Sequence, residues 1–392
     1  MFYTRDILPQ LEKELLAKEN LIITGMRQVG KTTILNYLFS LIKISNKVLL
    51  DLENPLYRKI FEEEDYNAIW NNLQPFGITN NTRAFIFIDE VQNLPDISRV
   101  AKYFYDHWSV KFIMTGSSSF YLRNLFSESM AGRKLVFEIF PLTFAEFLVF
   151  KGIKRTSMDS FREKAKNKNS IKHAGLLPYY REFVEFGGFP AVVVEKDQER
   201  KKTLLLEIFK SYFEQDAKKL ADFADMSKLR DLILLLVPRV GSQLEIAKLA
   251  NSLSLSRTTV YAYLSFLEQT YFITLLPKFT KSIDRQAAGS QKLYLCDSGM
   301  TNALGKVSYG QLFEQSIFQS LRTKHKLNFF RKDSSEIDLI LDERTALEAK
   351  VTASKQDIAH LKARIKSISI SESFVVTEQY SNLEEVIVAT DI

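Results

Sequence analysis

The 392-residue chain contains a single cysteine, Cys296. One cysteine can form neither an intrachain disulfide nor a zinc-knuckle site, which agrees with a reducing compartment. No stretch of the sequence approaches the roughly 18 consecutive apolar residues of a membrane-spanning helix, and residues 1–6 lack the apolar core of a secretory signal. We therefore expect a cytoplasmic protein that has no membrane partner.

The composition, with 46% hydrophobic and 26% charged residues, is that of a soluble globular protein, and the length predicts two or three domains. The net charge of +6 and the pI near 9.0 favour a polyanionic partner, although the excess is small. The segment 151–172 is unusually basic, and both a solvated helix face and a contact with nucleic acid or an acidic partner remain open for it. Its basic residues are Lys151, Lys154, Arg155, Arg162, Lys164, Lys166, Lys168 and Lys172.

A glycine-rich loop, G-M-R-Q-V-G-K-T-T over residues 25–33, follows an apolar run and precedes a helical pattern. Between a strand and a helix, this spacing predicts a phosphate cradle rather than a structural turn, because the glycines let backbone amides wrap a polyphosphate. Lys31 is predicted to reach the β and γ phosphates, and Thr32 to hold Mg²⁺. The predicted nucleotide-binding residues are Gly25, Arg27, Gln28, Val29, Gly30, Lys31, Thr32 and Thr33.

Two further predicted strands end in polar residues. The apolar run 84–89 closes on Asp89 and Glu90, and ligands of open α/β sheets gather at such strand ends. We expect Asp89 to hold the Mg²⁺ through water and Glu90 to activate a water against the γ-phosphate, the alternative being a solvated strand end. A third strand, 111–114, leads into Thr115 and Ser117, which we expect to sense the γ-phosphate unless they merely form a turn.

The nucleotide is predicted to be ATP, because the Asn-Lys-x-Asp motif of guanine-specific enzymes is absent. Strands predicted at 20–24, 47–51, 84–89, 111–115 and 134–139, with helical patterns between them, give an α/β fold that looks like the core of the AAA-superfamily ATPases.

The resemblance extends over nearly the whole chain. Motifs at 25–33, at 87–92 (Phe-Ile-Asp-Glu-Val-Gln), at 115–118 (Thr-Gly-Ser-Ser), at 131–133 (Ala-Gly-Arg) and at 140–147 (Phe-Pro-Leu-Thr-Phe-x-Glu-Phe) resemble a large group of prokaryotic ATPases. In that group an AAA-type module is followed by a winged helix and a domain resembling the PD-(D/E)xK nucleases. The resemblance implies that Arg133 acts as an arginine finger toward a neighbouring subunit, and hence a homo-oligomer. A structural salt bridge is the alternative role of Arg133.

Residues 229–279 are predicted to form a winged helix-turn-helix. Residues 243–250 have helical spacing, 253–256 make the turn, Ser256 caps a second helix at 257–267, and 271–279 is expected to be the wing hairpin. The second helix is predicted to expose Arg257, Thr258, Thr259, Tyr261 and Tyr263, which are residue types that contact phosphates or base edges. Packing or oligomerisation is the alternative role of this module.

Carboxylates cluster in the C-terminal part of the chain. Alternation places Glu336 and Asp338 on one face of a predicted strand at 336–341, and Glu348 and Lys350 on one face of the next, at 344–351. If these strands pair, the carboxylates are predicted to share a divalent metal, with Lys350 orienting the nucleophile. The arrangement resembles the core of PD-(D/E)xK nucleases, and Glu314 matches their acidic helix position. The resemblance implies that Glu314, Asp338 and Glu348 are the metal ligands. A Gln-x-x-x-Tyr element, found in many of them downstream, is absent.

The sequence thus predicts four parts: an AAA-type P-loop domain at 1–150, a helical lid or linker at 151–225, a winged helix at 226–282 and a nuclease-like α/β domain at 290–392. The predicted function is a Mg²⁺-dependent ATPase that acts on nucleic acid, DNA rather than RNA, with a C-terminal domain that binds or cuts the strand. The alternative is a slow nucleotide-operated signalling switch whose nuclease-like domain is an inactive interaction platform.

Overall fold

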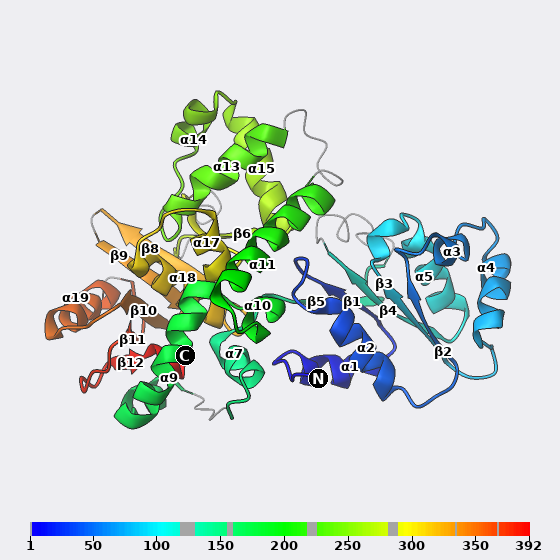
Figure 1. The fold of residues 1–392 in the computed structure, drawn as a ribbon, viewed down its shortest axis with the longest axis horizontal. Coiled ribbons are helices and arrows are strands. Elements are labelled where there is room, and N and C mark those ends of the chain that lie inside the picture. Colours follow the sequence, from blue (N-terminus) through cyan, green and yellow to red (C-terminus); the bar gives the residue numbers. More distant parts are fainter. Residues whose placement is uncertain are drawn as a thin grey trace. The chain divides into compact units, whose positions relative to one another are not determined.

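The structure is a computed structural model that describes residues 2–117, 130–154, 160–217, 226–280, 289–333, 335–366 and 368–392. The chain divides into two compact units (Figure 1). The first consists of Met1–Phe140, Ser211–Ala221 and Gln269–Tyr271, and the second of Pro141–Lys210, Asp222–Glu268 and Phe272–Ile392. The polypeptide therefore returns twice to the first unit through short segments. The division into four parts stays a prediction.

The first unit contains a five-stranded sheet in the order β2-β3-β4-β1-β5. Neighbouring strands all pair in parallel. The strands β1, β3 and β4 are buried along their whole length, which explains their nearly continuous apolar sequences. The α/β class and the predicted strands of this unit are confirmed. The strands are β1 (Asn20–Thr24), β2 (Lys47–Asp51), β3 (Ala84–Asp89), β4 (Val110–Gly116) and β5 (Lys134–Glu138).

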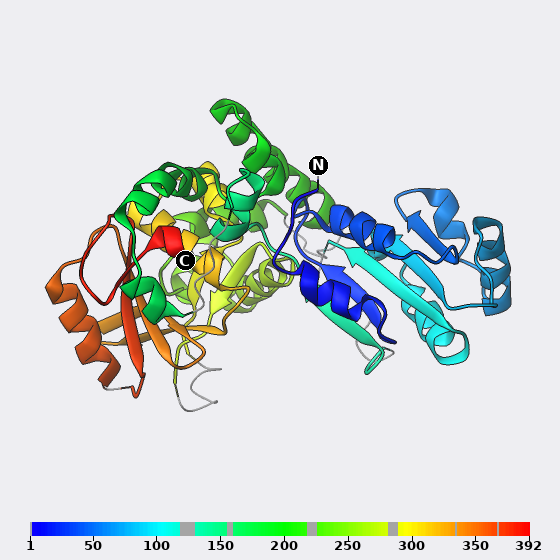
Figure 2. The same ribbon diagram turned by 90° about the horizontal axis from the view of Figure 1, so that it is seen from below.

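Helices cover both faces of this sheet (Figures 1 and 2). Phe39 of α2 packs edge-on against Phe87 of β3, with ring centroids 5.2 Å apart. Phe104 of α5 packs against Phe112 of β4, which pairs with Ile86, so α2 and α5 lie on opposite faces. The helices of the unit are α1 (Leu8–Leu15), α2 (Lys31–Leu41), α3 (Pro55–Lys59), α4 (Tyr66–Leu73) and α5 (Ile97–His107).

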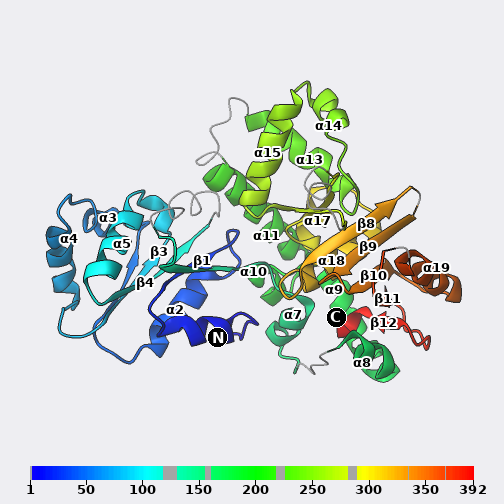
Figure 3. The same cartoon turned by 180° about the vertical axis from the view of Figure 1, so that it is seen from behind.

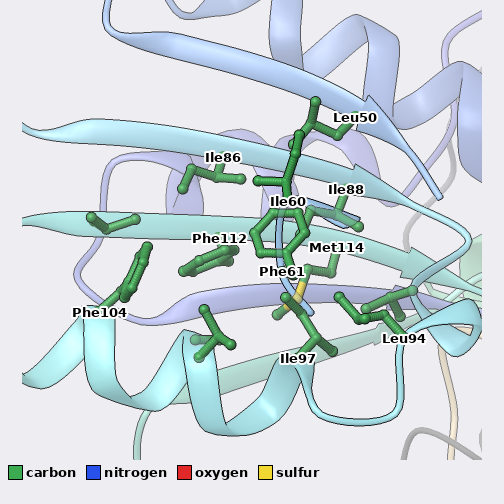
Figure 4. Packing of buried hydrophobic residues seen from close by; sticks show 14 of the residues in the cluster. Leu50, Ile60, Phe61, Ile86, Ile88, Leu94, Ile97, Phe104, Phe112 and Met114 are labelled. Atoms are coloured by element: carbon green, nitrogen blue, oxygen red, sulfur yellow. The ribbon is translucent and has the colours of Figure 1, made fainter. Parts of the chain in front are cut away.

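A hydrophobic core lies between the sheet and α5 (Figure 4). Ile86 and Phe112 from the strands meet Phe104 from α5, and all three side chains are fully buried. Trp70 and Trp108, the two tryptophans of the chain, pack against this cluster. Their fluorescence therefore reports on the first unit.

The second unit contains a mixed five-stranded sheet in the order β12-β11-β10-β9-β8. The strands β8, β9 and β10 are antiparallel neighbours, as predicted for the hairpin that carries Asp338 and Glu348, whereas β11 and β12 add in parallel. The helix α19 (Lys355–Lys366) packs Ile358 and Leu361 on the sheet (Figure 3). The strands are β8 (Leu327–Lys332), β9 (Ser335–Leu341), β10 (Thr345–Lys350), β11 (Glu372–Thr377) and β12 (Val386–Val388).

Helices form most of the rest of the second unit. The helix α9 ends at Phe186, because Gly187 has φ of +75° and Pro190 begins α10. The helices are α7 (Phe144–Phe150), α8 (Phe161–Lys166), α9 (Ser170–Phe186), α10 (Pro190–Val194), α11 (Gln198–Ser211), α13 (Met226–Leu236), α14 (Ile246–Leu253), α15 (Arg257–Gln269), α17 (Ser298–Leu304) and α18 (Tyr309–Leu321).

The region of the predicted winged helix differs from expectation in two details. The amide of Thr259 donates to Ser256 Oγ at 3.0 Å, so the predicted cap of α15 is present. Tyr263, however, is 3% exposed, because the helical period places it on the inner face with Val260 and Leu267. The hairpin predicted within 271–279 is also wrong: this stretch forms one strand, β6 (Ile273–Leu276), which pairs with the distant β7 (Lys292–Leu295).

We expect Phe112→Ala to destabilise the first unit by about 3–5 kcal/mol, because the truncation leaves a cavity beneath α5. Denaturant unfolding followed by tryptophan fluorescence measures this loss. Leu56→Ala is the control, since Leu56 is 68% exposed, and it should change the free energy of unfolding by less than about 0.5 kcal/mol. An equal effect of the two substitutions would contradict the core assignment.

Candidate active site

The glycine-rich loop joins β1 to α2. Gly25 and Gly30 have φ of +147° and +99°, and Gln28 between them has φ of +61°. A Cβ on Gly25 would lie 2.1 Å from the carbonyl oxygen of Ile139, so the close approach of two backbones requires glycine there. Gly30 caps α2 in the left-handed region, which leaves the first amides of the helix at the end of the loop.

Lys31 lies inside this loop. Its Nζ donates to the carbonyl oxygens of Gly25 at 2.7 Å and Met26 at 2.9 Å, and its side chain is buried. Burial lowers the pKa of Lys31 to about 8, although the carboxylates of Glu90 and Asp216 oppose this. The ammonium group is thus held at the centre of the loop by neutral carbonyls.

The two predicted acidic residues lie at the same edge of the sheet as the loop. The register pairs Thr24 with Gly116 and Ile88 with Met114, so β1, β3 and β4 end together. Asp89 accepts a hydrogen bond from the hydroxyl of Thr115, and the amide of Glu90 donates to Thr115 Oγ1 at 3.3 Å. Three of the predicted site residues therefore form one hydrogen-bonded group.

The oxygen donors at this edge fit Mg²⁺. Thr32, the second residue of α2, is exposed, and Asp89 has its carboxylate oriented by the hydroxyl of Thr115. A hydroxyl and a carboxylate are the hard ligands that Mg²⁺ takes beside phosphate oxygens and water.

The other predicted loop residues differ in exposure. Thr33 is exposed on the same helix turn as Thr32, whereas Val29 is buried and its carbonyl accepts a hydrogen bond from Arg5 Nη1 at 3.0 Å. Arg5 also donates to Phe140 O at 2.8 Å, a bracing role that nothing in the sequence indicated.

Asp216 is a site residue that sequence reasoning missed. It belongs to the π-helical segment Tyr212–Ala217, in one of the short returns to the first unit. Its Oδ1 accepts from Arg27 Nε at 3.0 Å and from Ser117 Oγ at 3.0 Å, and its side chain is 3% exposed. Burial raises the pKa of the Asp216 carboxyl, with Arg27 opposing.

A chain of hydrogen bonds connects Glu90 to Arg27. Gln92 Nε2 donates to a carboxylate oxygen of Glu90 and to Ser117 Oγ at 3.2 Å. Ser117 in turn donates to Asp216, which also accepts from Arg27. Gln92 belongs to the motif at 87–92 that resembles the ATPase family, but the sequence indicates no role for it. Ser118 and Ser119, in the same predicted loop as Ser117, lie outside the described residues.

Arg133 is not brought to the loop of its own chain. It precedes β5, whose first residue pairs with Asn20 at the amino end of β1, whereas the loop follows the carboxyl end. Its Nε donates to Asp106 Oδ1 at 2.7 Å. Two other arginines lie near Arg133 in the sequence. Arg99 pairs with Asp96 at 3.6 Å, and Arg123 lies outside the described residues. A role for Arg133 toward a second copy of the chain stays a prediction.

The predicted acidic cluster of the second unit surrounds a lysine. Lys292, at the start of β7, places its Nζ 2.8 Å from Glu314 Oε1, 2.8 Å from Glu336 Oε1 and 3.3 Å from Asp338 Oδ1. Its side chain is 0% exposed. Burial opposes the charge of Lys292, but Tyr294 and the carboxylates keep its pKa well above the ordinary value. The structure thus brings Glu314 and Asp338 together on an ammonium group.

Burial, reinforced by Asp338, raises the pKa of Glu314 to about 7, and Tyr294 donates to Glu314 Oε1 at 2.6 Å. Glu348 is held elsewhere, by Arg364 Nη1 at 2.8 Å and Lys350 Nζ at 3.2 Å. Among the described residues, no group of three or more His, Cys, Asp and Glu side chains has the geometry to hold a metal ion.

Comparisons with known proteins agree with the geometry of the first unit. Residues 17–148 match the family model described as an AAA domain. This part of the chain thus resembles an AAA-type domain. Residues 177–311, outside this AAA-type domain, match a family model described as a domain of unknown function. No helix within the described ranges is long and apolar enough to span a membrane.

Relatives are similar along most of the chain. An uncharacterized protein of Methanocaldococcus jannaschii is 29% identical over 381 residues, which cover 92% of this chain and 82% of the relative. An uncharacterized protein of Haemophilus influenzae is 25% identical over 389 residues, covering 94% of this chain and 92% of the relative. The AAA-type domain and the segments that follow it thus occur together in both.

Solved structures are more distant. The Walker-type ATPase of Pyrococcus abyssi has 15% identity and a TM-score of 0.47, with 77% of this chain and 96% of that chain covered. The ORC2 protein of Aeropyrum pernix, in ADPNP–ADP complexes, has 10% identity and a TM-score of 0.40, with 82% and 95% covered. At these values the likenesses say nothing about function.

We expect Lys292→Met to destabilise the protein by about 3–5 kcal/mol, because it leaves three carboxylates without their buried cation. Denaturation followed by far-UV circular dichroism measures the loss. The tryptophan signal should shift less, since both tryptophans lie in the first unit.

Lys248→Met is the matched control, because Lys248 is 71% exposed and pairs with Glu245 on a helix surface of the same unit. It should cost less than about 1 kcal/mol. If Lys292→Met is as mild as this control, the ammonium group does not hold the cluster together.

Proposed function

We propose that the protein is a Mg²⁺-dependent ATPase that couples ATP hydrolysis to action on nucleic acid. The observation that carries the proposal is the convergence of the loop around Lys31 with Asp89 and Glu90 at the carboxyl edge of one parallel sheet. The match of residues 17–148 to the AAA domain supports it.

The loop residues supply the grip on the triphosphate. The amides at the start of α2 point toward a bound anion, and Lys31 brings a buried positive charge to the β and γ phosphates. Thr32 and Asp89 would hold Mg²⁺, the first directly and the second through water. A bound metal would neutralise the charge that develops on the phosphate oxygens during hydrolysis.

Glu90 is the proposed group that activates water. The water oxygen attacks the γ-phosphorus, its proton passes to the Glu90 carboxylate, and the bond from the γ-phosphorus to the β–γ bridging oxygen breaks to leave ADP and phosphate. Gln92 orients the carboxylate through its side-chain amide, while Thr115 and Ser117 stand at the end of β4 beside it. Because Glu90 has φ of +53°, its backbone is held in a strained conformation that aims the side chain.

Arg133 is proposed to complete the site of a second copy of the chain. It lies at the edge of the sheet remote from its own loop, and its side chain is 32% exposed. Hydrolysis then requires a homo-oligomer, and specific activity rises with protein concentration.

The nucleic-acid part of the proposal rests on α15. Its cap at Ser256 and its buried inner face agree with the predicted helix-turn-helix, and Arg257, Thr258 and Tyr261 are exposed on this helix. These side chains can contact phosphates and bases. The net charge of +6 agrees with a polyanionic partner.

A second candidate function is a slow nucleotide-operated switch whose nuclease-like domain is inactive. Lys292 favours it, because its ammonium group already neutralises Glu314 and Asp338, two of the three predicted metal ligands. Arg364 and Lys350 likewise engage the third, Glu348. Under this candidate the domain binds a partner without cutting it.

We expect Glu90→Gln to retain ATP binding and to lower turnover by about 10²–10⁴-fold, since the amide cannot accept a proton from water. Lys31→Ala should lose ATP binding, because it removes the charge at the centre of the loop. Calorimetric binding and a phosphate-release assay, with and without single-stranded, duplex and branched DNA, measure both effects.

Glu62→Gln, which removes an exposed carboxylate from the same unit, is the control and should behave as wild type. Undiminished turnover of Glu90→Gln would remove Glu90 from its role. Stimulation by DNA favours the nucleic-acid function, and slow, unstimulated turnover favours the switch.

We expect no Mg²⁺- or Mn²⁺-dependent cleavage of nucleic acid by the wild type, because Lys292 and Arg364 engage the carboxylates that a metal would need. A nicking assay on supercoiled and branched DNA tests this. Cleavage that disappears in both Asp338→Ala and Lys350→Ala would establish a metal-dependent nuclease and exclude an inactive domain.

A further inference from the structure

Asp216 is a buried carboxylate placed where the proposed site should accept a polyanion. One of its oxygens, Oδ1, takes hydrogen bonds from both Arg27 and Ser117, at 3.0 Å each. Arg27 belongs to the glycine-rich loop, and Ser117 follows β4 at the predicted γ-phosphate position. Asp216 therefore engages two donors that a terminal phosphate would use.

The charge of Asp216 adds to that of two other carboxylates. Asp89 and Glu90 close β3 at the same edge of the sheet, and a bound Mg²⁺ offsets part of their charge. Asp216 itself is held by Arg27 and Ser117. A γ-phosphate brought to the same donors would face a like charge at short range in a water-poor site, where such repulsion is strong.

We propose that Asp216 is an internal competitor of the γ-phosphate, so that the carboxylate and the third phosphate alternate on Arg27 and Ser117. This inference rests on the proposed ATPase function and adds a regulation of the same site. ADP leaves the contacts of Asp216 intact, and ATP replaces them. Asp216 thereby makes the site read the number of phosphates, at a cost in affinity for ATP.

The segment that carries Asp216 is suited to respond. Tyr212–Ala217 is π-helical, a conformation that occurs mostly as single turns within α-helices and is frequent at functional sites. The start of the segment is fixed by a 2.7 Å hydrogen bond between the hydroxyls of Tyr212 and Thr270, the latter in the other short return to the first unit. The same segment continues directly from α11, whose residues up to Lys210 belong to the second unit. Displacement of Asp216 therefore acts on α11 through the backbone.

The test is calorimetric binding of Mg-ADP and of a non-hydrolysable Mg-ATP analogue to full-length wild type and Asp216→Asn. The asparagine keeps an oxygen acceptor for Ser117 and removes the charge. We expect affinity for the ATP analogue to rise about tenfold and affinity for ADP to change less than about twofold. Glu214→Gln is the matched control, because Glu214 is exposed on the same segment, and its affinities should equal those of wild type.

An unchanged or lowered ratio of ATP to ADP affinity in Asp216→Asn overturns the proposal, since Asp216 would then only position Arg27. An equal gain in Glu214→Gln also overturns it, because a general field effect would explain both. Wild type that binds neither nucleotide refutes the proposed function itself, whereas binding with an unaltered preference refutes only the competitor.

Hydrogen exchange of wild-type protein supplies a measurement independent of the variant. With the ATP analogue, amides of residues 212–217 should exchange about tenfold faster than with ADP, because the segment loses its anchor at Asp216. Equal exchange with the two nucleotides contradicts displacement of the carboxylate even if Asp216→Asn fails to fold.

Discussion

The parallel alignment of β1, β3 and β4 is the constraint on which the site depends. Because β4 lies between the other two, their carboxyl ends meet at one edge, in the register Thr24 to Gly116 and Ile88 to Met114. The glycine-rich loop, the acidic pair and the hydroxyls of β4 share a site only through this order. The backbone approach of Gly25 to Ile139 then fixes where the loop begins.

Three buried lysines differ in the groups that compensate their positive charge. The difference distinguishes a lysine that can bind an anion from lysines that stabilise the fold. Lys31 hydrogen-bonds to the neutral carbonyls of Gly25 and Met26, so its positive charge remains available to an incoming anion. Lys111 is likewise held by the carbonyls of Glu14 and Ala17. These carbonyls lie at the end of a helix, where their partial negative charge satisfies Lys111, so this lysine has a structural role. Lys292 instead meets carboxylates, which satisfy its charge within the fold.

Local patterns in the sequence were enough to predict the strands of the first unit, the loop at 25–33 and the cap at Ser256. Such patterns do not predict contacts between residues that are far apart in the sequence. Residues 271–279 contain one strand, β6, because its partner is the distant β7 and not a second strand within this stretch. Asp216 reaches Arg27 across 189 positions, and no periodicity or motif marks such a contact. The position of Lys292 among the carboxylates could not be predicted from the sequence for the same reason.

The position of Asp216 places part of the candidate site beyond the end of the matched AAA-type domain. The match to the AAA domain ends at residue 148, yet the site includes a buried carboxylate 68 positions later that binds both Arg27 and Ser117. A fragment that stops near residue 150 loses this acceptor and presents the loop with a different charge. If Asp216 competes with the γ-phosphate as proposed, the nucleotide affinity of such a fragment describes a different site, and the preference between ADP and ATP is a property of the longer chain.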